Sequence, residues 1–222
     1  MKKTYREIAE DKAFGLLGEM KDWRLSNFIH FVLTQVKDEF FTAPGSRAQH
    51  HDFRGGLGYH SACAAELGKK IANHYNEIGI KVDTDLVIAG ILLHDIGKMK
   101  CYRWDEEKEV EDKEGNITKG AYAHTAVGTM FHHIPIGFEL VARLGREYND
   151  MMYEQNAHIE QERLDQLLHI ILSHHGRRSW SSPVIPQFME AYIVHAVEMM
   201  DGYVDKFNDG KKVSTIYDGV TY

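Results

Sequence analysis

The sequence predicts one all-α domain with a single small β-hairpin. Apolar residues recur every three or four positions along most of the 222 residues, as on the buried face of a helix. A strand-like pattern is confined to residues 100–120. No internal repeat, low-complexity tract or long linker divides the chain. We therefore expect a single domain over 1–222, with N-terminal helices in 1–45, a core in 46–207 and a C-terminal tail in 208–222.

The first forty residues are predicted to form two helices. Apolar residues at helical spacing mark them: Leu16, Leu17 and Met20 in the first, and Leu25, Phe28, Ile29, Val32, Leu33 and Val36 in the second. Residues 42–46 contain proline and glycine and interrupt this pattern. The stretch 50–60 is rich in glycine, which tolerates left-handed backbone and lets another segment approach closely. It is therefore predicted to be a loop.

Two helices are predicted next, over about 60–75 and 83–97. On the first, His60 lies in line with apolar residues at helical spacing. In the second, an apolar run of eight residues ends directly before His94 and Asp95. All three polar side chains therefore continue a buried stripe instead of leaving it.

The second half of the chain is predicted to contain the hairpin and three more helices. The helices are expected over 125–144 with a break at Pro135, over 161–175 and over 187–207. Each of them places histidine or aspartate in line with its apolar residues, as His133, His174 and Asp201 show.

Composition excludes several classes of protein. With 26 basic and 33 acidic residues the net charge is -7, which gives no general attraction to nucleic acid or to an anionic membrane. The longest apolar run is far shorter than the ~20 residues that span a bilayer, and no signal peptide is recognised. Two cysteines, Cys63 and Cys101, form no disulfide framework. We expect a cytoplasmic protein without a membrane partner, and leave its oligomeric state open.

Histidine and aspartate side chains lie on the buried faces of five predicted helices. They are His60, His94, Asp95, His133, His174, His175 and Asp201. Any one of them alone is more readily explained as a core or capping residue, but together they would carry a large desolvation cost unless they share a partner. Imidazole and carboxylate ligands suit Mn, Fe, Ni or Zn. The set exceeds one ordinary site, so we expect two divalent metal ions bridged by Asp95, with 46–207 as the metal-binding core.

The order of these residues resembles the HD superfamily of metal-dependent phosphohydrolases. Leu-Leu-His-Asp-Ile-Gly-Lys at 92–98 is nearly the consensus of the central motif of that family. His133 and the pair His174-His175 are similar to the additional ligands of the dinuclear branch, which includes the HD-GYP cyclic-dinucleotide phosphodiesterases. The Gly-Tyr-Pro signature of that subgroup is missing.

Three further segments are similar to the HD domain of bacterial 3′-to-5′ exoribonucleases. They are HHDFRGGLGYH at 50–60, LSHHG at 172–176 and SPVIP at 182–186. The similarity covers roughly 50–207. It implies a phosphodiesterase or nuclease that hydrolyses phosphate esters of RNA or oligonucleotides by a metal-bridged hydroxide. The implied partner is a phosphorylated substrate, a nucleotide or a short nucleic acid.

The resemblance also implies roles for individual residues. One ion would be held by His60, His94, Asp95 and Asp201, and the second by Asp95, His133, His174 and His175. Lys98, one turn past Asp95, either contacts a phosphate oxygen or the leaving group, or is a cation favoured by a helix C-terminus. Arg54, His124 and Arg177 lie next to ligand segments and are predicted to contact substrate.

Two other functions stay open at this point. The same site would suit a nucleotide phosphomonoesterase or a cyclic-dinucleotide phosphodiesterase. A different class of protein, a non-catalytic sensor that binds a nucleotide on this scaffold, is disfavoured because a silent sensor would be free to lose ligands. Turnover of diesters and monoesters separates these alternatives.

Overall fold

The computed structural model describes residues 3–46, 51–111 and 117–208. Helix α5 (Thr84–Leu93) occupies its centre. The side chain of Asp83 caps it by accepting a hydrogen bond from the backbone N–H of Leu86. Every residue from Leu86 to Leu93 is buried, as expected for a helix that is apolar all round. Helices α2, α4, α9 and α10 pack around it, and this central position is what holds the segment after Leu93 in the interior.

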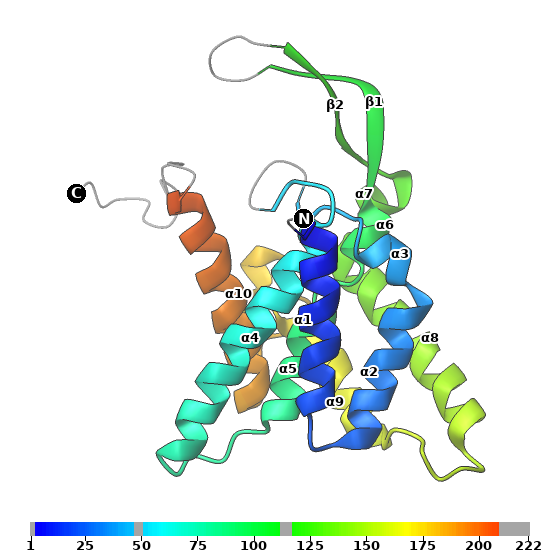
Figure 1. Cartoon of the computed structure of the whole chain (residues 1–222), viewed down its shortest axis with the longest axis vertical. Coiled ribbons are helices and arrows are strands. Elements are labelled where there is room, and N and C mark those ends of the chain that lie inside the picture. The colour runs from blue at the N-terminus through cyan, green and yellow to red at the C-terminus, as the bar shows by residue number, and fades with distance from the viewer. Residues whose placement is uncertain (1–2, 47–50, 112–116, 209–222) are drawn as a thin grey trace.

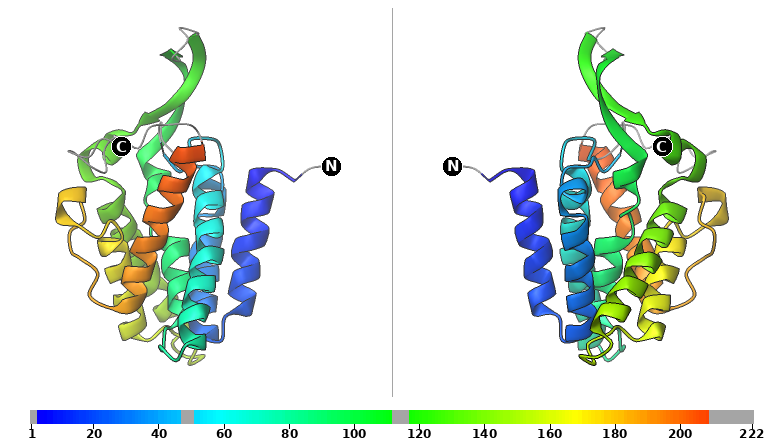
Figure 2. Two further views of the ribbon diagram at one scale, coloured as in Figure 1. Left: turned by 90° about the vertical axis from the view of Figure 1, so that its left-hand side faces the viewer. Right: turned by 90° about the vertical axis from the view of Figure 1, so that its right-hand side faces the viewer.

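The described residues confirm the predicted all-α fold with one hairpin (Figure 1). The helices are α1 (Tyr5–Glu19), α2 (Trp23–Gln35), α3 (Lys37–Phe40), α4 (Gly56–Glu77), α5, α6 (Lys98–Cys101), α7 (Ala126–Phe131), α8 (His133–Met152), α9 (Gln161–Ser173) and α10 (Met189–Asn208), with a 3-10 turn at Arg178–Trp180. Helix α1 lies on the outside of the bundle against α2 and α4 (Figure 2). Residues 209–222 of the predicted tail, and position 50 of the motif 50–60, lie outside the described residues.

The glycine-rich stretch differs from its prediction, because its second part, from Gly56 to His60, is helical. Helix α4 begins at Gly56, four residues before His60, and Gly55 precedes it with a left-handed φ of 87°. A Cβ atom on Gly56 would lie 2.0 Å from the carbonyl oxygen of His51. Glycine is needed there for close packing inside a helix, and this packing brings His51 against the start of α4.

Two helix ends also differ from their predictions. Helix α5 ends at Leu93, and residues 94–97 form turns before α6. The break expected at Pro135 lies instead at His132, whose φ of 63° separates α7 from α8. Pro135 falls in the first turn of α8, where a missing N–H costs nothing.

The hairpin consists of β1 (Tyr102–Glu111) and β2 (Ile117–His124), which pair antiparallel. Tyr102 is opposite His124, and Trp104 is opposite Tyr122. The strands project from the end of the bundle where α4 begins and α10 ends (Figure 1). Within the described ranges, no helix combines the length and the apolar character that crossing a membrane requires.

Candidate metal centre

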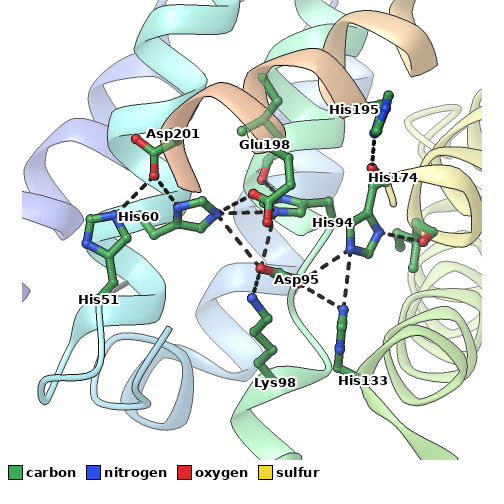
Figure 3. A network of polar contacts seen from close by, with 12 residues as sticks. His51, His60, His94, Asp95, Lys98, His133, His174, His195, Glu198 and Asp201 are labelled. Atoms are coloured by element: carbon green, nitrogen blue, oxygen red, sulfur yellow. Dashed lines mark hydrogen bonds and ion pairs between the residues drawn. The ribbon is translucent and has the colours of Figure 1, made fainter. Parts of the chain in front are cut away.

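Asp95 lies in the turn after α5 with both carboxylate oxygens fully buried (Figure 3). Its Oδ2 faces His94 at 3.3 Å, whereas its Oδ1 faces His133 at 3.1 Å and His174 at 3.6 Å. These are ion-pair contacts, and neither oxygen receives a well-aligned hydrogen bond from the described residues. A buried carboxylate whose oxygens lack such bonds is costly unless something else is bound there.

The first group of candidate ligands is His60, His94, Asp95 and Glu198, whose ligand atoms lie within 4.8 Å of one another. Oε2 of Glu198 lies 2.8 Å from Nε2 of His60 and 3.1 Å from Nε2 of His94. The two imidazole nitrogens are themselves 3.4 Å apart. Helices α4 and α10 and the turn after α5 therefore bring four donor atoms to one point.

The second group is His133, His174 and His175, again with ligand atoms within 4.8 Å. His133 is the first residue of α8, and the other two directly follow α9. Nε2 of His133 lies 3.3 Å from Nε2 of His174. Because Oδ1 of Asp95 faces both of these nitrogens, Asp95 lies between the two groups.

Backbone carbonyl groups orient three of the imidazole rings. The bonded pairs are Nδ1 of His94 with the oxygen of Ile91 at 2.6 Å, Nδ1 of His174 with Ile171 at 2.8 Å, and Nδ1 of His175 with Trp180 at 2.6 Å. A carbonyl oxygen only accepts, so Nδ1 carries the hydrogen and Nε2 is left for the centre. Metal-binding histidines are commonly oriented in this way.

Asp201 lies on the opposite side of His60 from Glu198. Its Oδ2 is 2.7 Å from Nδ1 of His60 and 3.0 Å from Nε2 of His51. Asp201, His60 and His51 form a third group whose ligand atoms lie within 4.8 Å of one another. Asp201 is therefore placed to hold the ring of His60, and Glu198 is the carboxylate of α10 that faces His94 and Asp95.

Lys98 supplies a buried positive charge to the centre. Its ammonium group contacts Oδ2 of Asp95, and only 8% of the residue is exposed. Burial lowers the pKa of Lys98, but the carboxylates of Asp95 and Glu198 raise it more, so that the net pKa is raised. Burial likewise opposes ionisation of Asp95, whose pKa is nevertheless held well below its usual value by Lys98 and His94.

The two groups of histidines have opposite pKa shifts. Burial lowers the pKa of both His60 and His94, but nearby carboxylates outweigh this effect. Glu198 raises the pKa of His60 to about 9. Asp95 raises the pKa of His94 to about 10. Burial prevails for His175, whose pKa falls to about 4, and it also lowers the pKa of His133 and His174. The second group is therefore neutral at pH 7 and has lone pairs free to bind an electrophile.

The side chains fit divalent metal ions. Imidazole nitrogens from separate elements converge at distances of 3.3 Å and 3.4 Å, and the carboxylate between them is buried without aligned hydrogen bonds. A cation gives each lone pair a partner and removes the cost of burying it.

The predicted substrate residues lie around this centre instead of within it. Arg54 lines a cavity at the base of the hairpin, and His124 ends β2 with its ring 5.0 Å from that of Tyr102. The guanidinium of Arg177 stacks over Trp180, 4.6 Å from the ring centroid. In the described part of the chain, none of these three residues forms a hydrogen bond or ion pair with a candidate ligand.

Glu198 is not among the metal ligands predicted from the sequence. A signal was present, because Glu198 follows Val194 by four residues and precedes Asp201 by three, which places all three on one face of α10. His51, which the sequence suggests either orients the glycine-rich stretch or lies on the surface, contacts Asp201.

The all-α fold and the buried set of histidines and carboxylates define a helical domain with a candidate metal centre. The chain belongs to the HD domain family, which matches residues 57–206. This confirms the resemblance inferred from the motifs.

Relatives with known names are similar over most of the chain. The 3′-5′ exoribonuclease YhaM of Oceanobacillus iheyensis is 31% identical over 195 residues, which is 88% of this chain and 53% of the relative. The enzyme of the same name from Listeria monocytogenes is 30% identical over 88% of this chain and 54% of the relative. The one from Bacillus subtilis is 29% identical over 90% of this chain and 57% of the relative. The chain thus spans about half the length of the curated relatives it matches. No solved structure matches it.

Proposed function

We propose that this chain hydrolyses phosphodiester bonds in RNA or short oligonucleotides with two divalent metal ions. The observation that carries the proposal is the position of Asp95, whose two buried oxygens face two different groups of histidines. A carboxylate in this position is suited to bridge two ions.

In this proposal each ion has four protein ligands. His60, His94, Asp95 and Glu198 would hold the first, and Asp95, His133, His174 and His175 would hold the second. Paired divalent ions supply a water molecule of lowered pKa and neutralise charge on phosphoryl oxygens. Asp201, which the resemblance suggested as a ligand, orients His60 through Nδ1.

Other residues of the chain position the substrate. Lys98 remains charged beside Asp95 and adds positive charge where a phosphate group would bind. Arg54 and Arg177 lie on segments next to His51 and His175, within reach of a longer substrate. Such local charge is needed because the net charge of -7 gives no general attraction to a polyanion.

RNA is the preferred substrate class because the relatives from three bacterial genera are named 3′-5′ exoribonucleases. The match to the HD domain family covers residues 57–206, which include the residues that form both groups of ligands. We extend the diesterase chemistry to this chain on that basis, together with the arrangement of its own side chains.

Reconstitution of metal-free protein with Mn²⁺ tests the proposal. Bis-p-nitrophenyl phosphate, p-nitrophenyl phosphate and a labelled RNA are offered to the wild type and to Asp95→Asn, with Asp165→Asn, an exposed carboxylate on α9, as control. We expect diester and RNA turnover in the wild type and the control, and its loss in Asp95→Asn. Turnover of the monoester alone would indicate a phosphomonoesterase, and no turnover with any divalent metal would indicate a nucleotide sensor.

A further inference from the structure

A cavity of about 750 Å³ lies at the base of the hairpin, between β1, β2 and the segment that follows α3. This volume is within the range of sites for small molecules and is large enough for a nucleotide. Its walls combine aromatic rings with charged groups. Nothing in the proposed metal chemistry uses it.

The hairpin wall of the cavity is aromatic. Trp104 and Tyr122 face each other across the strands with ring centroids 5.1 Å apart. The indole also lies over Gly120, where a Cβ atom would meet it at 2.4 Å. These contacts fix the position of Trp104, yet 53% of the residue is exposed. A fixed and exposed aromatic face is a suitable surface for stacking a nucleobase.

The segment before α4 also lines the cavity, and two of its side chains can bond the edge of a base. These are Asp52 and Arg54. Arg54 and Tyr122 line the same cavity. Carboxylates accept hydrogen bonds from the amino groups of bases, and arginine donates to their acceptors.

The cavity adjoins the metal centre on two sides. Met99, which lines it, directly follows Lys98, and Tyr102, another lining residue, begins β1 directly after α6, the short helix that starts at Lys98. On the other side, the ring of Phe53 is 6.0 Å from that of His51, the residue that contacts Asp201. A nucleotide with its base in the cavity therefore extends toward the centre with its phosphate.

We propose that this cavity is a nucleobase subsite in which a base of the substrate stacks on Trp104 while its phosphate lies at the metal centre. The proposal rests on the proposed function and adds to it a preference for nucleotide esters over other phosphodiesters. It predicts that removal of the indole affects only substrates that contain a base.

Two diesters with the same leaving group test this subsite. Thymidine 5′-(p-nitrophenyl phosphate) contains a base, and methyl p-nitrophenyl phosphate does not. In Trp104→Ala we expect the ratio of kcat/KM for the two esters to fall by about 5- to 150-fold, as loss of one base-stacking contact predicts. Trp23→Ala is the control, because Trp23 is exposed to a similar extent, 49%, at the opposite end of the bundle, where α2 begins (Figure 1). It should leave the ratio unchanged.

An unchanged ratio in Trp104→Ala, or an equal loss with both esters, overturns the subsite. If the wild type hydrolyses neither ester with any metal, the proposed function fails, and binding alone then decides on the subsite. In metal-free wild type and in metal-free Trp23→Ala, an oligothymidylate should quench the tryptophan fluorescence in a saturable way. In Trp104→Ala this quenching should be lost. Equal quenching in all three proteins would count against the subsite.

Discussion

Asp201 holds His60 by the ring nitrogen that faces away from the metal centre. The distance from its Oδ2 to Nδ1 of His60 is 2.7 Å, and Nε2 on the other side of the ring is 2.8 Å from Glu198. Two carboxylates, one turn apart on α10, thus clamp the same imidazole from both nitrogens. In metal sites the outer carboxylate orients the histidine, and the inner one binds the ion.

This geometry predicts different effects for the two carboxylates of α10. Glu198→Gln should lose one bound ion, because a direct ligand is weakened. Asp201→Asn should keep both ions and bind the first about 10- to 100-fold more weakly, the range seen when a group that orients a ligand is removed. Metal content after dialysis and Mn²⁺ titration measure both quantities. The reverse result, with loss of an ion only in Asp201→Asn, would make Asp201 the ligand.

The bridging position of Asp95 predicts that its loss affects both ions. Asp95→Ala removes the oxygens that face both groups, whereas His174→Ala removes a nitrogen from the second group only. From about two equivalents in the wild type, we expect Asp95→Ala to retain almost no metal and His174→Ala to retain about one equivalent. Elemental analysis of reconstituted protein gives the stoichiometry. Retention of one full equivalent in Asp95→Ala would show that Asp95 does not bridge.

Sequence patterns predicted the helices and most of the candidate ligands because both depend on which face of a helix is buried. A histidine that binds metal inside a helical bundle must lie on the buried stripe of its helix, so His60, His94 and His133 are visible as polar residues in line with apolar ones. Tertiary packing decides the rest. Helix α10 carries several acidic residues near its buried face, and only the position of α4 shows that Glu198 points inward at Nε2 of His60.

The helix break before His133 shows the same limit of sequence patterns. Proline at 135 was the stronger local signal, but it is compatible with the first turn of α8. The break occurs at His132 because the start of α8 packs on the turn after α5, where a Cβ atom on Gly97 would lie 2.0 Å from the carbonyl oxygen of His133. This contact between segments far apart in sequence cannot be read from either segment alone.

Lys98 is predicted to stabilise the metal-free protein much more than its neighbour Lys100. Removing one partner of a buried ion pair costs about 3–5 kcal/mol, because the other charge is left unpaired. Lys98→Met takes the buried ammonium group away from Asp95, which keeps the protonated ring of His94 as a partner, whereas Lys100→Met breaks an exposed pair with Glu39 that is worth about 1 kcal/mol or less. Denaturant unfolding in the presence of a chelator measures the two losses. Saturating Mn²⁺ should restore part of the loss in Lys98→Met, since a cation then compensates Asp95. Equal losses for the two lysines would contradict the buried pair.

Metal binding is predicted to release protons from the first group of ligands. Without metal the pKa values of His60 and His94 are about 9 and about 10, so both rings are protonated at pH 7.5, and an ion must displace these protons. His175, with a pKa of about 4, is already neutral and releases none. Calorimetric titration with Mn²⁺ in buffers of different ionisation enthalpy should count about two protons. A binding enthalpy independent of the buffer would contradict the prediction.

The same pKa values set the pH dependence of stability for the metal-free protein. His60 and His94 have folded pKa values above the ordinary 6.5, so their protonated forms favour the folded state fully below pH 6.5. This contribution is lost as the pH rises through about 9 and about 10. The melting temperature of chelator-treated protein should therefore fall between pH 7 and pH 10 more steeply than that of metal-loaded protein, in which an ion replaces the protons. Glu198→Gln removes the carboxylate that raises the pKa of His60, so the melting temperature of this metal-free variant should depend less on pH. An unchanged pH dependence in this variant would assign the effect to other groups.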